Sequence, residues 1–538
     1  MKLWLIECIA VITVLAIYLG IQVHWAWSSL LLIAIGLFSW WCYDFFQKRS
    51  AIQRNFPLVG HFREVAAWMR PKIYQYFVES DTEGRPFDKT MRDIVYQRAD
   101  KTDDTSPFGT QLDVYAEGYE WMNHSIAPID YRNIEEPRIW IGGKDCRQKY
   151  HMSLLNISAM SYGSLSTNAI SALNGGAALG GFAHNTGEGG ISPYHLMYGG
   201  DLIYQVGTGY FGCRASDGNF SPALFAERAN LPQVKMIELK LSQGAKPGHG
   251  GILPAAKVTE EIASIRNVPM GEDVLSPPFH KAFATPVELL QLVARMRSLS
   301  DGKPVGIKLC IGHKGEFLSI CKAMLHTDIK PDFIAIDGGE GGTGASPLEF
   351  SNSVGMPFKE GLSFAYNALV GFDLKEEVRL FASGKIITGF HMFRALALGA
   401  DVCYSARGMM IAMGCIQALE CNLNTCPTGV ATQNPKLTRG LVVTDKKQKV
   451  ANYHELTIRN FLELMSAAGI EHPDIINRSH IYRRTSQKES LRLDQIYPYI
   501  HKGCLLHKDT VPASWQFHMD NSSTEKFFIH QPLEYLHL

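Results

Sequence analysis

Three cysteines lie close together in the segment GCIQALECNLNTCPTGV, residues 414–430, with the spacing C-x5-C-x4-C. They are Cys415, Cys421 and Cys426. Three thiols are one too few for a structural zinc site and one too many for a disulfide. A zinc ion with a distant fourth ligand is one interpretation. A cuboidal iron–sulfur cluster with three irons is another, since it needs one thiolate per iron. The segment therefore predicts a metal or cluster site.

A second group of side chains suits an anionic substrate. Lys240, Gln243 and Lys246 occur within KLSQGAKPGHGG, and Arg266 follows further along the chain. Cationic and amide donors of this kind form a receptor for an anion, in particular a dicarboxylate. Surface lysines are usually only solvated. Lys240 ends a strongly apolar run, however, which favours an inward-facing side chain.

Two further ionisable residues have unusual neighbours. Lys308 lies inside the apolar run VGIKLC, where an unpaired charge is costly to bury. We expect its partner to be a phosphate, a carboxylate or an anionic reduced cofactor. Glu188 lies among glycines in NTGEGG, where a carboxylate can move protons at a reacting carbon. A solvated loop residue is the alternative for Glu188.

Glycine-rich loops indicate where a ligand approaches the backbone. Five glycines occur in the seven residues 338–344, directly after the apolar run FIAI. We expect a loop that is anchored on a buried strand and folded against a flat or bulky ligand, with a disordered linker as the alternative. ASGKIITG (382–389) and GADVCYSARG (399–408) each end a strand and open a helix. Such loops favour phosphate, although a pair of ordinary helix starts is the competing interpretation.

The elements that must position these residues are short apolar runs that alternate with helical patterns. The runs are residues 153–158, 182–187, 203–207, 234–241, 305–310, 333–339, 378–384 and 401–406. Helices are expected between them at 168–179, 285–298, 314–325 and 390–398. Eight strands that alternate with helices predict an α/β fold, a parallel (β/α)8 TIM barrel, with an open doubly wound sheet as the competing fold. The loops after the strands would then carry the chemistry.

The first 46 residues are almost uncharged and contain two apolar runs, Leu3–Val23 and Trp25–Phe46. About 20 residues of helix span the roughly 30 Å core of a bilayer, so the runs predict a two-helix transmembrane hairpin. Basic residues occur at Lys2 and from Lys48 onward, with none in the turn. This places both ends and the catalytic domain in the cytoplasm, at the inner (cytoplasmic) membrane. A cleavable signal peptide is the alternative for the first run. Cytoplasmic thiols stay reduced.

The net charge and the distribution of apolar runs indicate the class of protein and its division into domains. Lysine plus arginine and aspartate plus glutamate number 52 each, and this zero net charge argues against a nucleic-acid binder. We divide the 538 residues into a transmembrane hairpin (1–46), a covering segment (47–150), the barrel with the cysteine loop (151–440) and a C-terminal helical segment with a tail (441–538). Within the last of these, a helix is expected at 455–468.

Taken together, these segments resemble the synthase domain of glutamate synthases, the flavin and iron–sulfur proteins that make glutamate from 2-oxoglutarate. The resemblance runs from about Ile157 to about Leu437. It rests on sequence motifs that occur in the same order as in the family: ISAMSYGSLS, NTGEGG, ELKLSQGAKPGHGGILPAAKV, SPPFH, DGGEGGTGASP and CIQALECNLNTCPTGVATQNP.

The resemblance implies FMN in the barrel and a [3Fe–4S] cluster on the three cysteines. It places Met160 and Ser161 beside the flavin and Lys308 near its pyrimidine ring. The remaining cofactor contacts that it implies, to the flavin and its phosphate, are Gly338, Gly339, Gly342, Thr343, Gly384, Ala406, Arg407 and Gly408.

The resemblance also assigns the substrate side of the site. By analogy, Gln243, Lys246 and Arg266 bind 2-oxoglutarate, whereas Glu188 and Lys240 lie near the reacting centre. The implied activity is that of an oxidoreductase acting on CH–NH2 groups, the reductive amination of 2-oxoglutarate. Electrons from a donor such as ferredoxin or a reductase would enter through the cluster, and ammonia or an amine would come from solution or from a partner subunit.

The sequence also departs from the family pattern. No glutaminase domain precedes the barrel and residue 2 is lysine, so we expect no release of ammonia from glutamine by the chain itself. His249 and Ile252 replace a Glu and a Gln, and Ser383 and Lys385 replace an Asp and a Gly of the phosphate loop. These features resemble the stand-alone glutamate synthase-like proteins. Synthesis of an N-alkylated glutamate, other amine and oxo-acid chemistry on FMN, and a non-catalytic electron-transfer subunit at the membrane are the alternatives.

Overall fold

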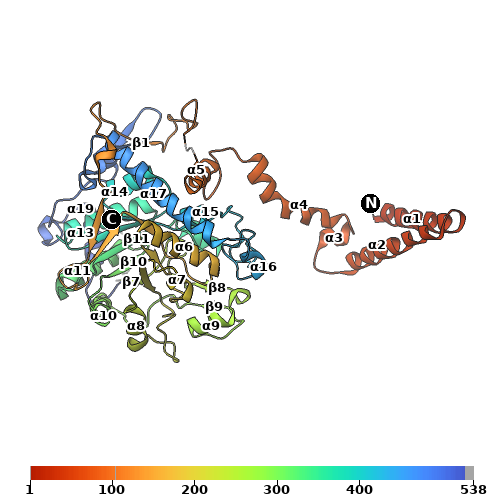
Figure 1. Cartoon of the computed structure of the whole chain (residues 1–538), viewed down its shortest axis with the longest axis horizontal. Coiled ribbons are helices and arrows are strands. Elements are labelled where there is room, and N and C mark those ends of the chain that lie inside the picture. The colour runs from red at the N-terminus through yellow and green to blue at the C-terminus, as the bar shows by residue number, and fades with distance from the viewer. Residues whose placement is uncertain (1, 103–104, 528–538) are drawn as a thin grey trace, which may run out of the picture. The chain divides into compact units, whose positions relative to one another are not determined.

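The computed structural model describes residues 2–102 and 105–527 (Figure 1). The chain forms two compact units, Met1–Lys89 and Thr90–Leu538. The larger unit contains every predicted catalytic, cofactor and cysteine residue. The finer division of the chain at residues 46, 150 and 440 stays a prediction.

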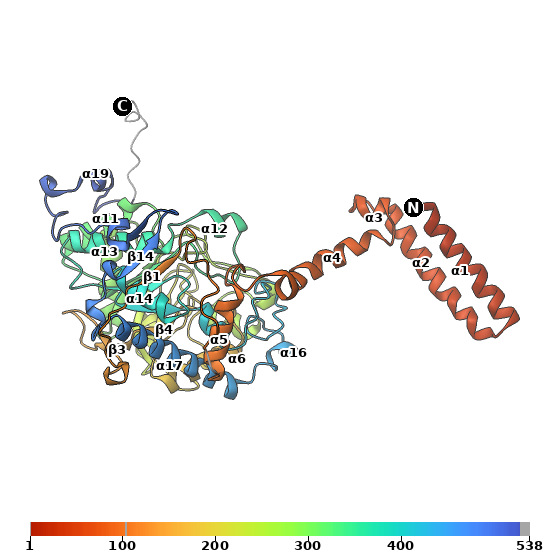
Figure 2. The same ribbon diagram turned by 90° about the horizontal axis from the view of Figure 1, so that it is seen from above.

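The larger unit is built on a closed barrel of eight parallel strands (Figures 1 and 2). The strands are β4 (Leu155–Ile157), β5 (His184–Asn185), β6 (Leu202–Val206), β7 (Val234–Lys240), β10 (Val305–Leu309), β11 (Phe333–Asp337), β12 (Arg379–Ser383) and β13 (Val402–Ser405). β13 pairs with β4, so the sheet has no free edge, and the open-sheet alternative is wrong. Each strand lies within one predicted apolar run, apart from Leu202, which precedes its run by one residue.

Helices follow the strands and cover the barrel. They are α6 (Thr167–Gly180), α7 (Pro193–Leu196), α8 (Pro222–Ala229), α10 (Pro286–Leu299), α11 (Lys314–Thr327), α13 (Phe358–Gly371), α14 (Gly389–Ala397) and α15 (Arg407–Ala412). Capping residues in the sequence mark where helices start, as α10 illustrates. The Thr285 hydroxyl accepts from the Glu288 N–H at 3.1 Å, and the Glu288 carboxylate accepts from the Thr285 N–H, which forms a capping box.

A hairpin closes the amino-terminal end of the barrel. Its strands, β2 (Arg138–Ile141) and β3 (Tyr150–Ser153), are antiparallel. Ile141 and Met152 are fully buried in the same apolar cluster as Ile203, Phe333 and Phe381 of the barrel strands. Because this apolar plug fills one end, polar side chains within the barrel are gathered toward the other end.

The remaining elements of the larger unit complete its outer layer. They are α5 (Lys89–Asp100), β1 (Glu120–Met122), β8 (Ile252–Leu253), α9 (Glu260–Arg266), β9 (Val274–Leu275), α12 (Leu348–Ser353), α16 (Pro435–Thr438), α17 (Val443–Ala467), β14 (Ile481–Arg484), β15 (Ser490–Arg492), α18 (Leu493–Ile496) and α19 (Ala513–Asp520). α17 packs against α6 and α14, so the C-terminal helix belongs to the barrel's outer layer. It begins twelve residues before the predicted start at 455.

The smaller unit contains two packed apolar helices, α1 (Lys2–Gln22) and α2 (Ser29–Phe46). Ile9 of α1 and Trp41 of α2 are buried in one cluster between them. Among the described residues, only Trp25–Phe46 is long and apolar enough to cross a membrane, and the apolar helix before it, Ile6–Gln22, is shorter. The transmembrane hairpin therefore stays a prediction. Two short helices follow, α3 (Ala51–Asn55) and α4 (Gly60–Ile73), and α4 continues into a π-helical turn, Tyr74–Val78.

A buried carboxylate joins the small sheet β1–β14–β15 to the helices of the barrel. Glu120 on β1 contacts Lys359 of α13 at 2.5 Å, Arg394 of α14 at 2.7 Å and Arg483 of β14 at 2.8 Å. Burial alone would raise the pKa of Glu120, but Arg394 and Lys359 outweigh it and lower the pKa to about 2. The ionised carboxylate thus links segments that are more than 200 residues apart in the chain.

We predict that Glu120→Gln lowers the free energy of unfolding at pH 7 by about 3 kcal/mol, because three partly buried cations lose their buried counter-charge. Since the folded-state pKa is below the ordinary value of 4.5, this stability is present above pH 4.5 and is lost as the pH falls toward about 2. Urea denaturation at several pH values measures it. Asp130→Asn, which breaks the exposed pair with Arg132, is the control and should change little. Equal denaturation midpoints for Glu120→Gln and the parent would contradict the assignment.

Candidate active site

The predicted site residues gather at the carboxyl ends of the barrel strands. Met160 and Ser161 follow β4, Glu188 follows β5 and Lys240 is the last residue of β7. Gln243 and Lys246 lie in the loop after β7, and Arg266 ends α9 in the excursion between β7 and β10. Lys308 lies within β10, and the loops after β11, β12 and β13 hold the remaining set: Gly338, Gly339, Gly342, Thr343, Gly384, Ala406, Arg407 and Gly408. The barrel thus brings segments 250 residues apart to one face.

A carboxylate and an ammonium group pair at the centre of this face. Glu188 Oε2 lies 3.0 Å from Lys240 Nζ, and the two side chains are only 16% and 11% exposed. Glycines make room for the carboxylate. A Cβ at Gly207 would lie 2.7 Å from Glu188 Oε2, and one at Gly251 would lie 2.5 Å from Glu188 Oε1. The loops after β5, β6 and β7 therefore enclose the pair.

Two further cations act on Glu188. Burial alone would raise its pKa, but Lys240, Arg266 and Lys246 together lower it, so Glu188 is ionised at neutral pH. Burial lowers the pKa of Lys246 to about 8 and that of Arg266 to about 10, in each case against the attraction of Glu188. Three cations thus surround one carboxylate. This excess of two positive charges matches a bound dicarboxylate.

Arg266 has unused hydrogen-bonding capacity. Its Nη2 donates to the Tyr162 carbonyl at 2.8 Å and to Ser161 Oγ at 3.4 Å, and its guanidinium lies 5.1 Å from the centre of the Phe211 ring. Its Nε is buried without a hydrogen-bond partner. Because a buried unpaired donor is costly, this atom points to an acceptor that a ligand would supply. Arg266 also joins α9 to the segment that contains Ser161.

Lys308 has the anionic partner that its burial requires. Its Nζ lies 3.6 Å from Asp337 Oδ2, and Lys308 is only 4% exposed. Asp337 also accepts from Ser383 Oγ at 2.7 Å and from the Gly244 N–H at 2.9 Å. The partner is thus a carboxylate, one of the three possibilities considered. Sequence reasoning missed Asp337 as a functional residue, although an acid that ends the buried strand FIAID was a signal.

The glycine loop after β11 is partly explained by internal packing. A Cβ at Gly338 would lie 2.4 Å from Phe358 Cβ, and one at Gly384 would lie 2.8 Å from the Phe358 ring. The Gly339 N–H donates to the Met356 carbonyl at 2.8 Å. Gly338 therefore has a packing role of its own, in addition to any contact with a ligand. Gly342 and Thr343 are exposed, so they remain accessible to a ligand.

The loops after β12 and β13 contain the predicted phosphate contacts. Ala406, the residue before α15, provides no side-chain cap, so the first N–H groups of α15 are not capped by its side chain. Arg407 donates to the Glu340 carbonyl at 2.7 Å and joins this loop to the glycine loop. Lys385 has a φ of 52°, in the left-handed region that favours glycine. The substitution at position 385 therefore keeps a backbone shape that suits glycine.

His249 and Ile252, which depart from the family pattern in the segment after β7, make local packing contacts. His249 Nδ1 donates to the Gly250 carbonyl at 2.9 Å, and its ring packs edge-on against Phe350. Ile252 pairs with Leu275 between β8 and β9. These contacts hold the loop after β7 in place.

The three cysteines lie in one loop after α15. Burial, with a contribution from the charges of Cys421 and Cys426, raises the pKa of Cys415 to about 12. Burial, with a smaller contribution from the charge of Cys426, also raises the pKa of Cys421, so the thiols are near one another. Within residues 2–102 and 105–527, no three His, Cys, Asp or Glu side chains are grouped so as to hold a single metal ion. The loop thus provides three neighbouring thiols without a preformed single-ion site.

A buried lysine joins this cysteine loop to the barrel. Lys257 Nζ donates to the Cys421 carbonyl and to the Ser164 carbonyl, each at 2.8 Å, and the residue is 1% exposed. It makes no ion pair with a carboxylate in the part of the chain that the structure describes. Burial lowers its pKa to about 8, while Cys421 and Cys426 act in the opposite direction. Sequence reasoning missed Lys257, although a lone lysine in the apolar run ILPAAKV was a signal.

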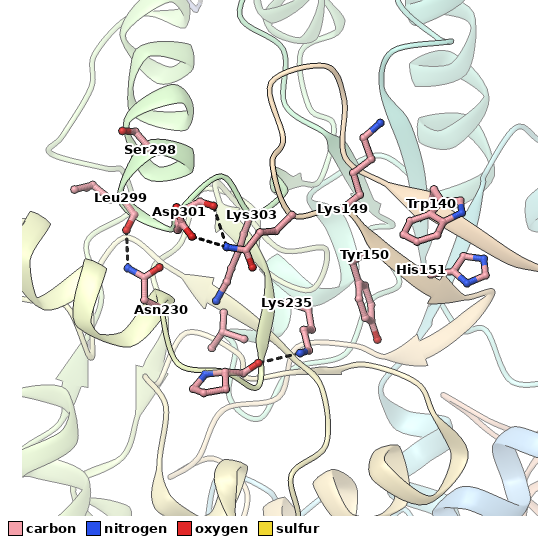
Figure 3. Close-up of a pocket in the computed structure, with 13 residues that line it drawn as sticks. Trp140, Lys149, Tyr150, His151, Asn230, Lys235, Ser298, Leu299, Asp301 and Lys303 are labelled. Atoms are coloured by element: carbon pink, nitrogen blue, oxygen red, sulfur yellow. Dashed lines mark hydrogen bonds between the residues drawn. The ribbon is translucent and has the colours of Figure 1, made fainter.

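A cavity of about 880 Å³ lies at the other end of the barrel (Figure 3). Val234, at the start of β7, and Lys303, just before β10, are among its lining residues. Lys303 donates to the Ala229 carbonyl at 2.7 Å and Lys235 to the Pro232 carbonyl at 2.9 Å. These lysines serve the protein's own backbone, and the cavity includes none of the predicted site residues.

The family described as the conserved region in glutamate synthase matches residues 101–471. The glutamate synthase large subunit-like protein YerD of Bacillus subtilis is 36% identical over 509 residues, which cover 87% of this chain and 96% of YerD. The archaeal glutamate synthase [NADPH] of Methanocaldococcus jannaschii is 35% identical over 315 residues, 58% of each chain.

Longer relatives and solved structures are less similar. The glutamate synthase [NADPH] large chain of Azospirillum brasilense is 33% identical over 335 residues, but this chain covers only 21% of it. Among solved structures, a flavocytochrome b2 with sulfite bound is 13% identical to this chain. The match covers 79% of this chain and 85% of the flavocytochrome b2 chain, with a TM-score of 0.43. The family match and the full-length similarity to YerD agree with the motifs gathered at the barrel's carboxyl face, and the chain belongs to the glutamate synthase family.

Proposed function

We propose that this protein is a glutamate synthase-like oxidoreductase that reductively aminates 2-oxoglutarate. The observation that carries the proposal is the buried Glu188–Lys240 pair with Lys246 and Arg266 beside it, an anion receptor with a proton-transfer pair inside it. The family match and the names of the relatives support the same reaction class. We also propose that the first unit anchors the protein in the cytoplasmic membrane, supported by the apolar helix Trp25–Phe46.

The residues present fit FMN. The exposed backbone of Gly342 and Thr343 would lie against the flavin with Met160 and Ser161, and Lys308 would face its pyrimidine ring. Gly384 and the backbone of residues 406–408 at the start of α15 would hold its phosphate. When bound, FMN would supply the hydride that reduces the imine formed from 2-oxoglutarate and ammonia.

The residues of the cysteine loop fit a [3Fe–4S] cluster as the entry point for electrons. Cys415, Cys421 and Cys426 provide one thiolate for each iron. Lys257 is a buried cation with carbonyl partners alone, and thiolate charge beside it would supply the anion that its burial requires.

Different residues of the chain would bind the substrate and transfer protons. Arg266 and Lys246 would bind the carboxylates of the oxo acid, with Gln243 as an amide donor, and orient its ketone carbon. Condensation with ammonia releases water, so the departing hydroxyl needs a proton and the nitrogen must lose one. Lys240 holds a proton that it can give, and Glu188, ionised beside it, can accept one. The buried position of the pair limits access of bulk water.

We predict that anaerobically purified protein, given a reductant, ammonium and 2-oxoglutarate, forms glutamate. Glu188→Gln should lower kcat by about 100-fold or more, because proton transfer by a positioned side chain contributes at least that much. Product analysis by mass spectrometry and the flavin absorbance of each variant measure the two effects. Asp301→Asn, at the cavity on the opposite end of the barrel, is the matched control. Absence of glutamate from protein with intact cofactors would contradict the substrate assignment, and methylamine in place of ammonium tests for an N-alkylated product.

We predict that the affinity for 2-oxoglutarate falls as the pH rises through about 8. Lys246 is cationic below its pKa of about 8 and loses its charge above it, so the attraction to a carboxylate is present at low pH and absent at high pH. Calorimetric titration with 2-oxoglutarate between pH 6.5 and 9.5 should show a decline of up to about tenfold per pH unit above pH 8. Lys246→Arg should keep its affinity at pH 9, whereas Lys235→Met, at the other end of the barrel, should follow the parent. A pH-independent affinity would refute this role of Lys246.

We predict three irons and one FMN per chain in anaerobically purified protein. Cys426→Ser should lose most of the iron and its EPR signal, because each thiolate holds one iron. Cys504→Ser, another buried free cysteine, is the control and should keep both. Colourless protein that contains zinc would overturn the cofactor assignment.

A further inference from the structure

An amphipathic helix in the smaller unit has an exposed apolar face. It comprises α4 (Gly60–Ile73) and the continuous π-helical turn Tyr74–Val78. Apolar side chains recur at three- and four-residue intervals, which places them on one face of the helix. They are Phe62, Val65, Met69, Ile73 and Tyr76, followed by Phe77. Every residue from 62 to 74 is exposed, and Phe62 and Phe77 are 74% and 84% exposed. So continuous an apolar face indicates an interaction surface.

The charges on this segment border the apolar face. At 100° per residue, Arg63 and Arg70 fall along one edge of it and Lys72 along the other. Glu64, the single acidic residue in the sequence from 60 to 78, falls on the opposite side. Lys72 Nζ lies 3.5 Å from the centre of the Trp68 ring. Long basic side chains at the edges of an apolar stripe can extend to lipid phosphates while their methylene groups cover apolar surface.

The start of α4 is fixed to the end of the candidate membrane span. Asp44, in the last turn of α2, is fully buried and lies 2.9 Å from His61 Nε2. The same carboxylate accepts from the Leu58 N–H at 2.8 Å, and Trp40 Nε1 lies 3.2 Å from His61 Nε2. α2 ends at Phe46. If Trp25–Phe46 crosses the bilayer, α4 therefore begins at the depth where hydrocarbon gives way to headgroups.

We propose that α4 and the turn Tyr74–Val78 lie in the surface of a membrane that contains anionic lipids. Phe62, Met69 and Ile73 would enter the boundary of the acyl chains, and Arg63, Arg70 and Lys72 would contact headgroup phosphates. The inference rests on the proposed membrane anchor and extends it. The contact is electrostatic in part, so it depends on lipid charge, whereas a transmembrane helix does not need anionic lipid.

Hydrogen exchange of the full-length protein tests this inference. The protein is placed in nanodiscs of phosphatidylcholine alone and of phosphatidylcholine with phosphatidylglycerol at about 3:1, and exchange is measured by mass spectrometry. Peptides from residues 62–78 should exchange at least tenfold more slowly in the anionic discs, because the lipid surface covers the helix. Peptides from residues 25–46 should be protected in both.

Charge variants identify the cause of any protection. The combined change Arg63→Gln, Arg70→Gln and Lys72→Gln should abolish the difference between the two lipid compositions. The matched control Arg132→Gln, Lys144→Gln and Arg147→Gln removes three exposed basic charges elsewhere and should keep that difference.

Each other outcome overturns the inference in a distinct way. Rapid exchange at 62–78 in both discs, with 25–46 protected, would refute the surface helix while the anchor stands. Rapid exchange at 25–46 would refute the anchor and the surface helix together. Protection that is independent of lipid charge and rises with protein concentration would assign the apolar face to a second copy of the chain.

Discussion

The burial of charge at the carboxyl end of the barrel constrains the rest of the catalytic unit. Glu188 is ionised in a nearly closed site because Lys240, Lys246 and Arg266 surround it. These charges stand on three segments, the loop after β5, β7 with its following loop, and α9, so their distances are fixed only if the barrel closes and its other end is filled with apolar side chains. The β2–β3 hairpin fills that end. A looser barrel would admit water, and the electrostatic advantage of the buried ions would fall with the higher local dielectric.

The sequence allowed the eight strands to be predicted because each is a short apolar run that ends at a glycine-rich loop. Once the runs form a barrel, the chemistry-bearing loops must meet at one face, which is why Glu188, Lys240 and Lys308 could be named beforehand. Partners that meet across distant loops carry at most a weak local signal, such as a single charged residue in an apolar run. Asp337, Lys257 and Glu120 were missed for that reason, since their roles depend on contacts with Lys308, Cys421 and Arg394. The start of α17 was missed because residues 443–454 include a strongly charged stretch, DKKQK.

Asp337 explains one departure from the family's phosphate loop, the serine at position 383. Ser383 donates a hydrogen bond to this carboxylate at 2.7 Å. The aspartate that the resemblance leads one to expect at position 383 would place a second carboxylate at the same point, where like charges repel. Serine instead supplies a donor, so Asp337 can remain the counter-ion of Lys308. One substitution thus alters the balance of charge next to the proposed flavin site without removing the buried lysine.

The same electrostatics set an order for the proposed reaction. An excess of two positive charges at Glu188, Lys240, Lys246 and Arg266 repels ammonium, the form that dominates in neutral water. A bound dicarboxylate neutralises that excess, and an amine can then enter at lower electrostatic cost. The oxo acid should therefore bind first, and ammonia should arrive as the neutral molecule. A source that delivers ammonia directly to the barrel's carboxyl face would meet the second requirement, since the ammonia need not cross bulk water, where it would be protonated.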